Sequence, residues 1–219
     1  MTVNQPIVIT IGRQFGSGGR ELGKKLADRL GFKYYDKELL SEAAEHAGVD
    51  KAFFERCDER FPKFFNGIFS FAFGLSNVNC YAGSTSISDD SIYRAQSDFI
   101  HSLAERSNCV IVGRTSDYVL RDHERLVNIF VHAPIENCVA RIMARDEENL
   151  TAEKARAKAI RMNKLRANYY NFYTDKEWGA ASSYDLTFDT SRIGMDKVVD
   201  VIVAYITSRF PDFTPGCVE

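Results

Sequence analysis

A glycine-rich stretch near the N-terminus has the residue types best suited to binding an anion. It reads Gly12-Arg-Gln-Phe-Gly-Ser-Gly-Gly-Arg20 and stands between an apolar run at 7–11 and a helical pattern at 21–30. A strand, a glycine-rich turn and a helix N-terminus together bind phosphate, because outward-pointing N–H groups, close backbone approach and the helix dipole all favour negative charge. The stretch therefore predicts a phosphate-binding loop, and a tight turn without a ligand is the alternative.

Charged residues follow two further segments that are expected to be strands. Asp36 comes shortly after the first helical pattern, and Gly113 and Arg114 directly follow the apolar run 109–112, with Asp117 three residues further on. Charged side chains at the carboxyl end of a parallel strand are placed for ligand contact. The alternatives are a helix N-cap for Asp36 and a surface salt bridge for Arg114.

A third group of candidates consists of arginines in the second half of the chain: Arg141, Arg145, Arg156, Arg161 and Arg166. Arginine forms paired hydrogen bonds with phosphate oxygens, so a mobile segment with these residues could close over a phosphorylated ligand. Arg145 and Arg161 are 16 residues apart and Arg161 and Arg166 are five apart, so they cannot all lie on one helix face. A solvated basic helix is the alternative for any one of them.

Alternating strands and helices are expected to position these residues. Continuous apolar runs at 7–11, 109–112 and 126–131, with a weaker one at 184–188, are typical of strands buried on both faces of a parallel sheet. Helical patterns stand between and after them, the last of them ending before Pro211. The alternation predicts βαβ units and an α/β fold with an open, mostly parallel sheet of about five strands.

Two stretches are too long for simple crossovers and predict insertions on this core. The stretch 37–106 contains an apolar helix face formed by Phe61, Phe64, Phe65, Ile68 and Phe69. That face is expected to pack within the protein, and a dimer interface or an apolar substrate wall is the alternative. The stretch 146–178 ends in tyrosines and a tryptophan, which fit either aromatic packing or stacking on a base.

The composition limits the class of protein. The chain has 219 residues, a net charge of −2 and 45% hydrophobic residues, which is enough for one domain with its own core. The balanced charge argues against a nucleic-acid partner or a membrane surface, and no apolar run approaches the roughly 18 residues that span a bilayer. Five scattered cysteines, no metal-ligand spacing and no signal peptide indicate a cytoplasmic protein with reduced thiols.

The glycine-rich stretch resembles the loop of nucleoside monophosphate kinases, specifically the cytidylate-kinase-like family. Cytidylate kinases carry a loop reading D-G-P-S-G-S-G-K-G-T, which aligns without gaps on Gly12 to Glu21 and shares the core 16–18. The family lysine then falls on Gly19, the first loop glycine on Arg13, and the magnesium-associated threonine on Glu21. A divergent branch with a lysine-less G-R-Q-[FY]-G-S-G-G-R loop is the closer match. Because the P-loop lysine neutralises phosphate charge, Arg13 or Arg20, or Lys24 one turn further on, is expected to replace it.

Further segments carry the resemblance over most of the chain. Leu30-Gly-Phe-Lys-Tyr-Tyr-Asp36 is similar to the family's L-G-F-x-Y-L-D-T-G, and Gly113-Arg114 matches its G-R-D element, with Asp117 displaced from the family aspartate. The resemblance implies a three-layer α/β/α P-loop kinase fold in one domain, 1–219. Its core would be 1–36, 107–145 and 179–219, with an acceptor-binding insert at 37–106 and a helical lid at 146–178.

The resemblance also assigns roles to residues, with ATP and Mg²⁺ as cofactors. The implied catalytic residues are Arg13, Arg20, Arg145, Arg161 and Arg166. The implied ATP-binding residues are Gly12, Gly16, Ser17, Gly18, Gly19, Glu21, Ser191 and Arg192, with Glu21 also the metal ligand. The implied acceptor-binding residues are Asp36, Arg94, Gln96, Gly113, Arg114 and Asp117.

The expected function is ATP-dependent phosphoryl transfer to a nucleoside monophosphate, with CMP or dCMP as the first choice. The altered insert and the displaced Asp117 leave another small-molecule acceptor as an alternative. Gly19 leaves a second alternative, a nucleotide-binding regulatory protein without catalysis. The Phe-rich insert allows a homodimer.

Overall fold

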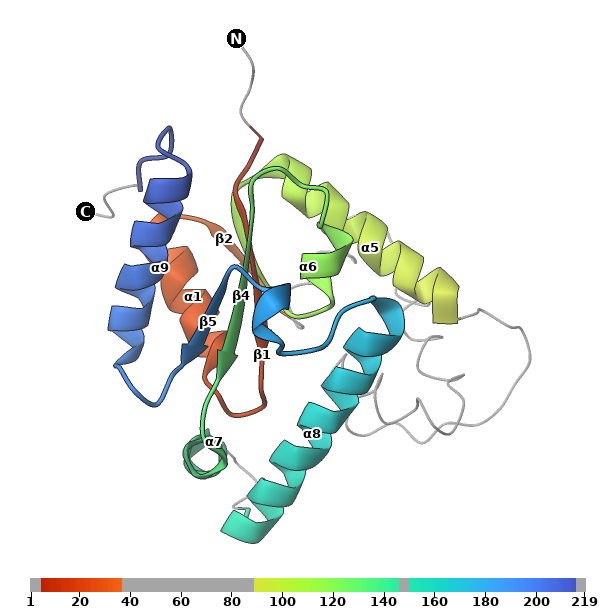
Figure 1. Ribbon diagram of the computed structural model, residues 1–219, viewed down its shortest axis with the longest axis vertical. Helices are drawn as coiled ribbons and strands as arrows, with labels where there is room; N and C mark the ends of the chain where they lie inside the picture. The colour runs from red at the N-terminus through yellow and green to blue at the C-terminus, as the bar shows by residue number, and fades with distance from the viewer. Residues whose placement is uncertain (1–4, 37–88, 146–149, 216–219) are drawn as a thin grey trace.

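The described residues, 5–36, 89–145 and 150–215 of the computed structural model, form one five-stranded parallel sheet (Figure 1). The strand order is β2-β3-β1-β4-β5, so β1 is central and Val8 lies opposite both Cys109 and Leu126. The strands are β1 (Val8–Arg13), β2 (Lys33–Tyr35), β3 (Cys109–Val112), β4 (Leu126–His132) and β5 (Leu186–Asp189). The expected open parallel sheet is thereby confirmed.

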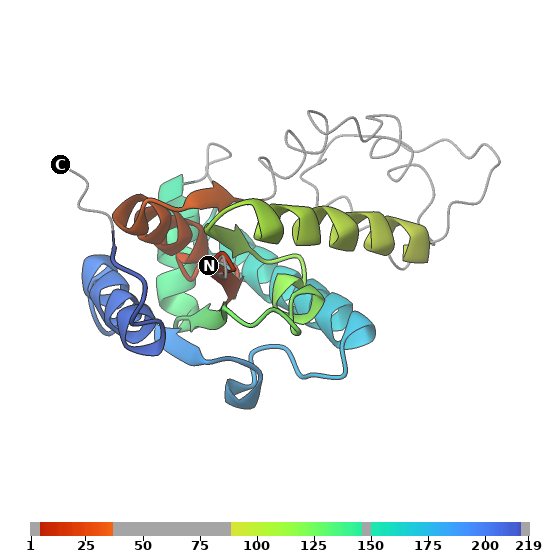
Figure 2. The same cartoon turned by 90° about the horizontal axis from the view of Figure 1, so that it is seen from above.

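Helices cover both faces of this sheet (Figure 1 and Figure 2). Because side chains alternate along a strand, Ile9 packs among residues of one helix pair, whereas its neighbour Val8 packs with Ile100 on the other face. The first face carries α1 (Gly19–Leu30) and α9 (Met195–Arg209), and the second carries α5 (Asp89–Arg106) and α6 (Ser116–Val119). The expected three-layer α/β/α arrangement is confirmed, although the short helix α6 was not predicted.

Two more helices lie beside the carboxyl ends of the strands, α7 (Ile135–Arg145) and α8 (Ala152–Tyr173) (Figure 1). They pack closely because α8 presents two buried alanines, Ala155 and Ala159, to Ile142 of α7. Helix α8 lies in the stretch expected to be a lid, and the 3₁₀ turn Ala181–Ser183 then leads into β5.

The Phe-rich face at 61–69, which would allow a homodimer, lies outside the described residues. None of the described helices combines the length and the apolar character that crossing a membrane requires.

Candidate active site

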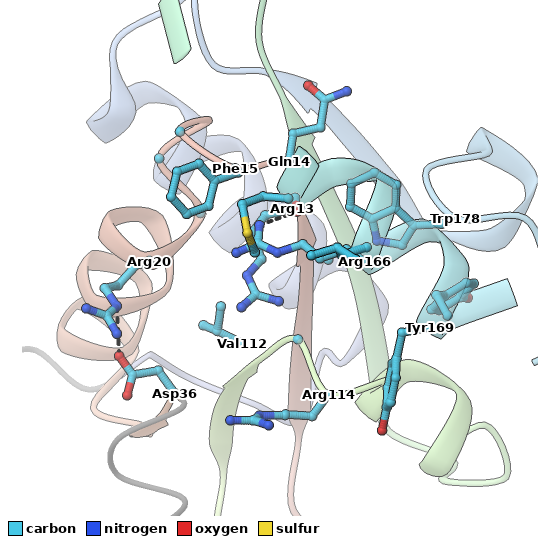
Figure 3. Close-up of a pocket in the computed structure, with 18 of the residues that line it drawn as sticks. Arg13, Gln14, Phe15, Arg20, Asp36, Val112, Arg114, Arg166, Tyr169 and Trp178 are labelled. Atoms are coloured by element: carbon cyan, nitrogen blue, oxygen red, sulfur yellow. Dashed lines mark hydrogen bonds and ion pairs between the residues drawn. The ribbon is translucent and has the colours of Figure 1, made fainter. Parts of the chain in front are cut away.

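A cavity of about 460 Å³ opens at the carboxyl ends of β1 and β3, between the sheet and helix α8. The glycine-rich loop forms its floor (Figure 3). Among the described residues, two carboxylates line it, those of Asp36 and Asp117, against seven cationic side chains: Arg13, Arg20, Arg114, Arg141, Arg145, Lys158 and Arg166. This excess of positive charge favours a ligand with several negative charges.

The loop between β1 and α1 is bent into a shape that glycine permits. Gly16 and Gly18 have φ values of +83° and +92°, in the left-handed region. A Cβ on Gly16 would lie 2.7 Å from the carbonyl oxygen of Cys138, so the loop rests directly on α7. No side chain of the described residues caps α1 at Gly18, and the N–H groups of a first helical turn have no partner within the helix. These N–H groups can therefore bind phosphate oxygens.

Arg141 fixes this loop to the end of β5. Its Nη1 donates to the carbonyl oxygen of Ser17 at 3.1 Å, and its Nη2 donates to that of Thr190 at 2.9 Å. The Thr190 hydroxyl also donates to the Ser17 carbonyl, at 2.6 Å. Ser17 is itself buried, and its hydroxyl donates to the Gln14 carbonyl at 2.9 Å. These contacts hold the loop in place on the side that faces the protein interior.

Arg20 and Asp36 form an ion pair on one wall of the cavity, with 3.1 Å between Nε and Oδ2 (Figure 3). Asp36 is almost fully buried, and it also accepts a hydrogen bond of 3.3 Å from the Tyr34 hydroxyl. The carboxylate that follows β2 thus faces the ligand space and orients a guanidinium beside it.

Arg114 is directed into the cavity by a strained turn at the end of β3. Three consecutive residues, Gly113, Arg114 and Thr115, have positive φ values of +79°, +66° and +51°. Such a conformation costs of order 1 kcal/mol or more for each residue other than glycine, and it persists where the surroundings hold it. Here the Ser116 hydroxyl donates to the Gly113 carbonyl at 2.7 Å, and the Gln96 amide donates to the Arg114 carbonyl at 3.3 Å.

Arg13, Arg114 and Arg166 form a group of close cations. Burial lowers the pKa of Arg13 and of Arg114 to about 10. Burial also lowers the pKa of Arg166 well below its ordinary value, and repulsion from the other two guanidinium groups adds to the effect. An anion bound among them would offset this repulsion and raise their pKa values. The group is therefore a site where phosphate charge would be strongly stabilised.

Helix α8 is docked on the loop by two polar contacts. Nη1 of Arg166 donates to the carbonyl oxygen of Arg13 at 3.0 Å, and the side-chain oxygen of Asn163 accepts from the N–H of Phe15 at 2.7 Å. The Arg166 guanidinium also lies 5.4 Å from the centre of the Phe15 ring. Helix α8 therefore lies against the glycine-rich loop at one side of the cavity.

Aromatic side chains and Asp117 form the remaining wall. The Tyr170 hydroxyl donates to Oδ2 of Asp117 at 2.7 Å, and burial raises the pKa of that carboxyl. Tyr169 and Trp178 also line the cavity, whereas Tyr173 stacks on Tyr93 of α5 at 4.3 Å between ring centres. The aromatic segment at the end of the lid stretch thus supplies both packing and cavity wall.

The structure brings most of the residues expected from the sequence to one place. The cavity is lined by Gly12, Arg13, Gly16, Gly18, Gly19, Arg20, Asp36, Gly113, Arg114, Asp117, Arg145 and Arg166. The expected residues that do not line it are Ser17, Glu21, Arg94, Gln96, Arg161, Ser191 and Arg192.

Five of these seven residues lie at other places in the structure, and Ser17 supports the loop as described above. Arg94 and Arg161 are exposed, and Gln96 supports the Arg114 turn from behind. Ser191 and Arg192 interact with the Asp189 carboxylate at the end of β5.

Several cavity residues were not predicted from the sequence, above all Lys158, Met162, Leu165 and Tyr169 of α8. Together with Arg166, they line the cavity at spacings of three and four residues, which is one face of a helix. Arg161 is five residues from Arg166 and so lies on another face of the helix. The helical periodicity, counted from Arg166, would have predicted the other four residues. Arg141 was among the candidate arginines, but its contacts could not be predicted, because they are with carbonyl groups of Ser17 and Thr190, which are distant in sequence.

Glu21 lies just outside the cavity, where its carboxylate pairs with Nη2 of Arg145 at 2.8 Å. Within the described ranges, no group of three or more histidine, cysteine, aspartate or glutamate side chains could hold a metal ion. Mg²⁺ usually keeps several waters and binds one or two carboxylates plus substrate phosphates. Glu21 supplies one carboxylate near the loop, and its role as a metal ligand stays a prediction.

Comparison with known proteins agrees with this geometry. The sequence pattern of the cytidylate kinase-like family matches residues 8–192. The cytidylate kinase of Pyrococcus furiosus is 28% identical over 207 residues, which cover 94% of this chain and 91% of that protein. The cytidylate kinase of Methanopyrus kandleri is 26% identical over 209 residues, which cover 91% of this chain and 93% of that protein.

Solved structures give the same fold. The crystal structure of an uncharacterized protein from Eubacterium ventriosum has a TM-score of 0.70 and 30% identity, covering 94% of this chain and all of that one. Shikimate kinase from Bacteroides thetaiotaomicron, at a TM-score of 0.53, 13% identity and 94% and 98% coverage, shares the fold. The family pattern spans the glycine-rich loop, the Arg114 turn and helix α8, and this chain therefore belongs to the cytidylate kinase-like family.

Proposed function

We propose that this protein transfers the γ-phosphoryl group of ATP to a nucleoside monophosphate, with CMP or dCMP as the preferred acceptor. The observation that carries the proposal is the cavity itself, in which seven cationic side chains and two carboxylates surround a glycine-rich loop at the carboxyl ends of the strands. The relatives named cytidylate kinase support CMP as the first acceptor to test.

Phosphoryl transfer requires positioning and charge neutralisation more than covalent chemistry from the protein. In this proposal the N–H groups of the loop and of the first turn of α1 hold the ATP phosphates. Arg114, on its strained turn, holds the acceptor phosphate, and Arg166 stabilises charge on the group in transfer. Mg²⁺ would arrive with ATP and neutralise phosphate charge, and Glu21 would hold it.

Helix α8 has a second role in the proposal, the exclusion of water. Its contacts with the loop at Arg13 and Phe15 lie over the phosphate site, and its side chains Met162 and Leu165 line the cavity. A covered site directs the phosphoryl group to the acceptor hydroxyl or phosphate oxygen instead of to water. The stretch 146–178 would thus act as the lid and 37–106 as the acceptor-binding insert.

The test is ADP formation from Mg-ATP with CMP, dCMP, UMP, AMP and no acceptor. Turnover that depends on CMP or dCMP, and a rise in the acceptor KM in Arg114→Ala, is the expected result. Turnover with UMP or AMP alone would contradict the cytidylate assignment. A blank across the panel would contradict it too, and calorimetric titration with ATP would then show whether the protein binds the nucleotide at all.

A further inference from the structure

The side chain of Arg13 occupies the space above Gly19, the position at which the P-loop pattern has a lysine. A Cβ built on Gly19 would lie 2.6 Å from Cβ of Arg13 and 2.9 Å from its Cγ. It would also lie 3.0 Å from Cγ2 of Val131. The stem of Arg13 and a side chain at position 19 therefore exclude each other, and the absence of a Cβ at Gly19 is what admits the arginine.

The guanidinium end of Arg13 rests on a second glycine. A Cβ on Gly113, at the carboxyl end of β3, would collide with Nη1 of Arg13 and lie 2.7 Å from its Cζ. The side chain thus runs from the end of β1 across Gly19 to Gly113, and its charged end lies in the middle of the cavity (Figure 3). Two positions without side chains leave the path that this one long side chain follows.

The other two candidate cations occupy different places. Arg20 lies on the cavity wall in an ion pair with Asp36, at 3.1 Å. Lys24 is exposed and does not line the cavity. Only Arg13, of these three, runs through the space where a lysine stem at position 19 would begin.

We propose that Arg13 supplies the positive charge on the β- and γ-phosphates that a lysine at position 19 supplies in other P-loop kinases. The inference rests on the proposed function. It explains a reciprocal difference, because the cytidylate kinase loop has glycine where this chain has Arg13 and lysine where this chain has Gly19. The two cations enter one space from opposite sides, so a loop can hold either but not both. A guanidinium also offers two parallel hydrogen bonds to phosphate oxygens, which an ammonium group does not.

The experiment compares ATP and AMP affinities, by calorimetric titration, for the wild type, Arg13→Met, Arg20→Ala, Gly19→Lys and the double variant Arg13→Gly/Gly19→Lys. Methionine keeps an unbranched stem over Gly19 and removes the guanidinium group with its charge and its hydrogen-bond donors. We expect Arg13→Met to bind ATP at least about tenfold more weakly and AMP within about twofold of the wild type, because the lost contact is to the β- and γ-phosphates. We expect Gly19→Lys to lose ATP affinity through its collision with Arg13, and the double variant to regain about tenfold over Gly19→Lys.

Circular dichroism and thermal denaturation show which variants are folded, so that a loss of affinity is not a loss of structure. An unchanged ratio of ATP to AMP affinity in folded Arg13→Met would overturn the inference. So would a ratio that falls in Arg20→Ala and not in Arg13→Met, because Arg20 would then be the cation.

The same titrations separate this inference from the proposed function. If the wild type transfers no phosphate but the ratio of ATP to AMP affinity still falls in Arg13→Met, Arg13 is the phosphate-binding cation of a nucleotide-binding protein. If the wild type transfers phosphate and the ratio is unchanged, the proposed function stands and the role of Arg13 does not. A wild type that binds no ATP contradicts both.

Discussion

Nη1 of Arg166, on helix α8, donates a hydrogen bond of 3.0 Å to the main-chain carbonyl of Arg13, at the end of strand β1. The two residues are 153 positions apart in the sequence, and this contact joins the lid stretch to the central strand. It brings two guanidinium groups together in a cavity where burial already lowers both pKa values. The negative charge of a bound phosphate would make such an arrangement favourable.

Removal of the Arg166 guanidinium is expected to slow phosphoryl transfer. Because preorganised cations act on charge that develops in the transition state, Arg166→Ala should lower kcat by about 10² or more. Lys164→Ala is the matched control, since Lys164 is an exposed cation on the same helix and should change kcat by less than about twofold. Steady-state kinetics with Mg-ATP and CMP measures both. Equal effects from the two substitutions would show that α8 acts through its general charge.

The tight contact between the loop and α7 predicts a stability difference between two glycines. Gly16→Ala combines a φ of +83° with a Cβ 2.7 Å from the Cys138 carbonyl oxygen, and it should lower the free energy of unfolding by about 2 kcal/mol or more. Gly194→Ala places its Cβ in open space at a φ of −61° and should change that free energy by less than about 0.5 kcal/mol. Urea denaturation measures both values. A neutral Gly16→Ala would mean that the loop does not rest on α7 as described.

Asp117 predicts a pH dependence of stability. Burial raises its pKa above the unfolded value, so the folded state holds the proton more tightly and the free energy of unfolding falls as the pH rises from the unfolded to the folded pKa. Asp117→Asn removes this loss and keeps a carbonyl oxygen that accepts from Tyr170. The variant should therefore gain stability relative to the wild type as the pH rises through that window. Denaturation curves across the acidic to neutral range measure the difference, and a constant difference would contradict the assignment.

The buried thiols predict slow labelling of the native protein. Burial raises the pKa of Cys109 to about 12 and also raises that of Cys138. Because the thiolate is the reactive form, both should resist iodoacetamide at about pH 8 and react quickly in guanidinium chloride. Mass spectrometry of the two peptides follows the reaction. Rapid modification of Cys109 before unfolding would show that β3 opens more readily than its burial implies.

The fold could be predicted from the sequence because its central strands are continuous apolar runs. The expected strand 109–112 coincides with β3, and the one at 126–131 ends one residue short of β4. Helix α6 was missed, since four residues give too short a pattern for any periodicity. The register of the sheet depends on contacts between distant segments, which the sequence does not state.

The separate segments of the candidate site could be predicted from the sequence, but their positions relative to one another could not. The glycine-rich loop and the Gly113-Arg114 turn carry local signals, because glycines and a charge at a strand end have a physical meaning of their own. The spacing predicted that Arg145, Arg161 and Arg166 cannot all lie on one face. Which face is inside follows from burial in the structure, where the buried residues of α8 are Ala155, Ala159, Met162 and Tyr170. The path of Arg13 over Gly19 and Gly113 depends on three segments meeting, so no local pattern could show it.

The most direct test of phosphoryl transfer in this cavity follows a labelled phosphate. The wild type and Arg166→Ala are incubated with γ-³²P-ATP, Mg²⁺ and CMP or dCMP, and the nucleotides are separated by chromatography. Our account predicts label in CDP or dCDP for the wild type and about 10² less of it, at equal times, for Arg166→Ala. Label that stays in ATP or appears only as inorganic phosphate in the wild type would contradict it.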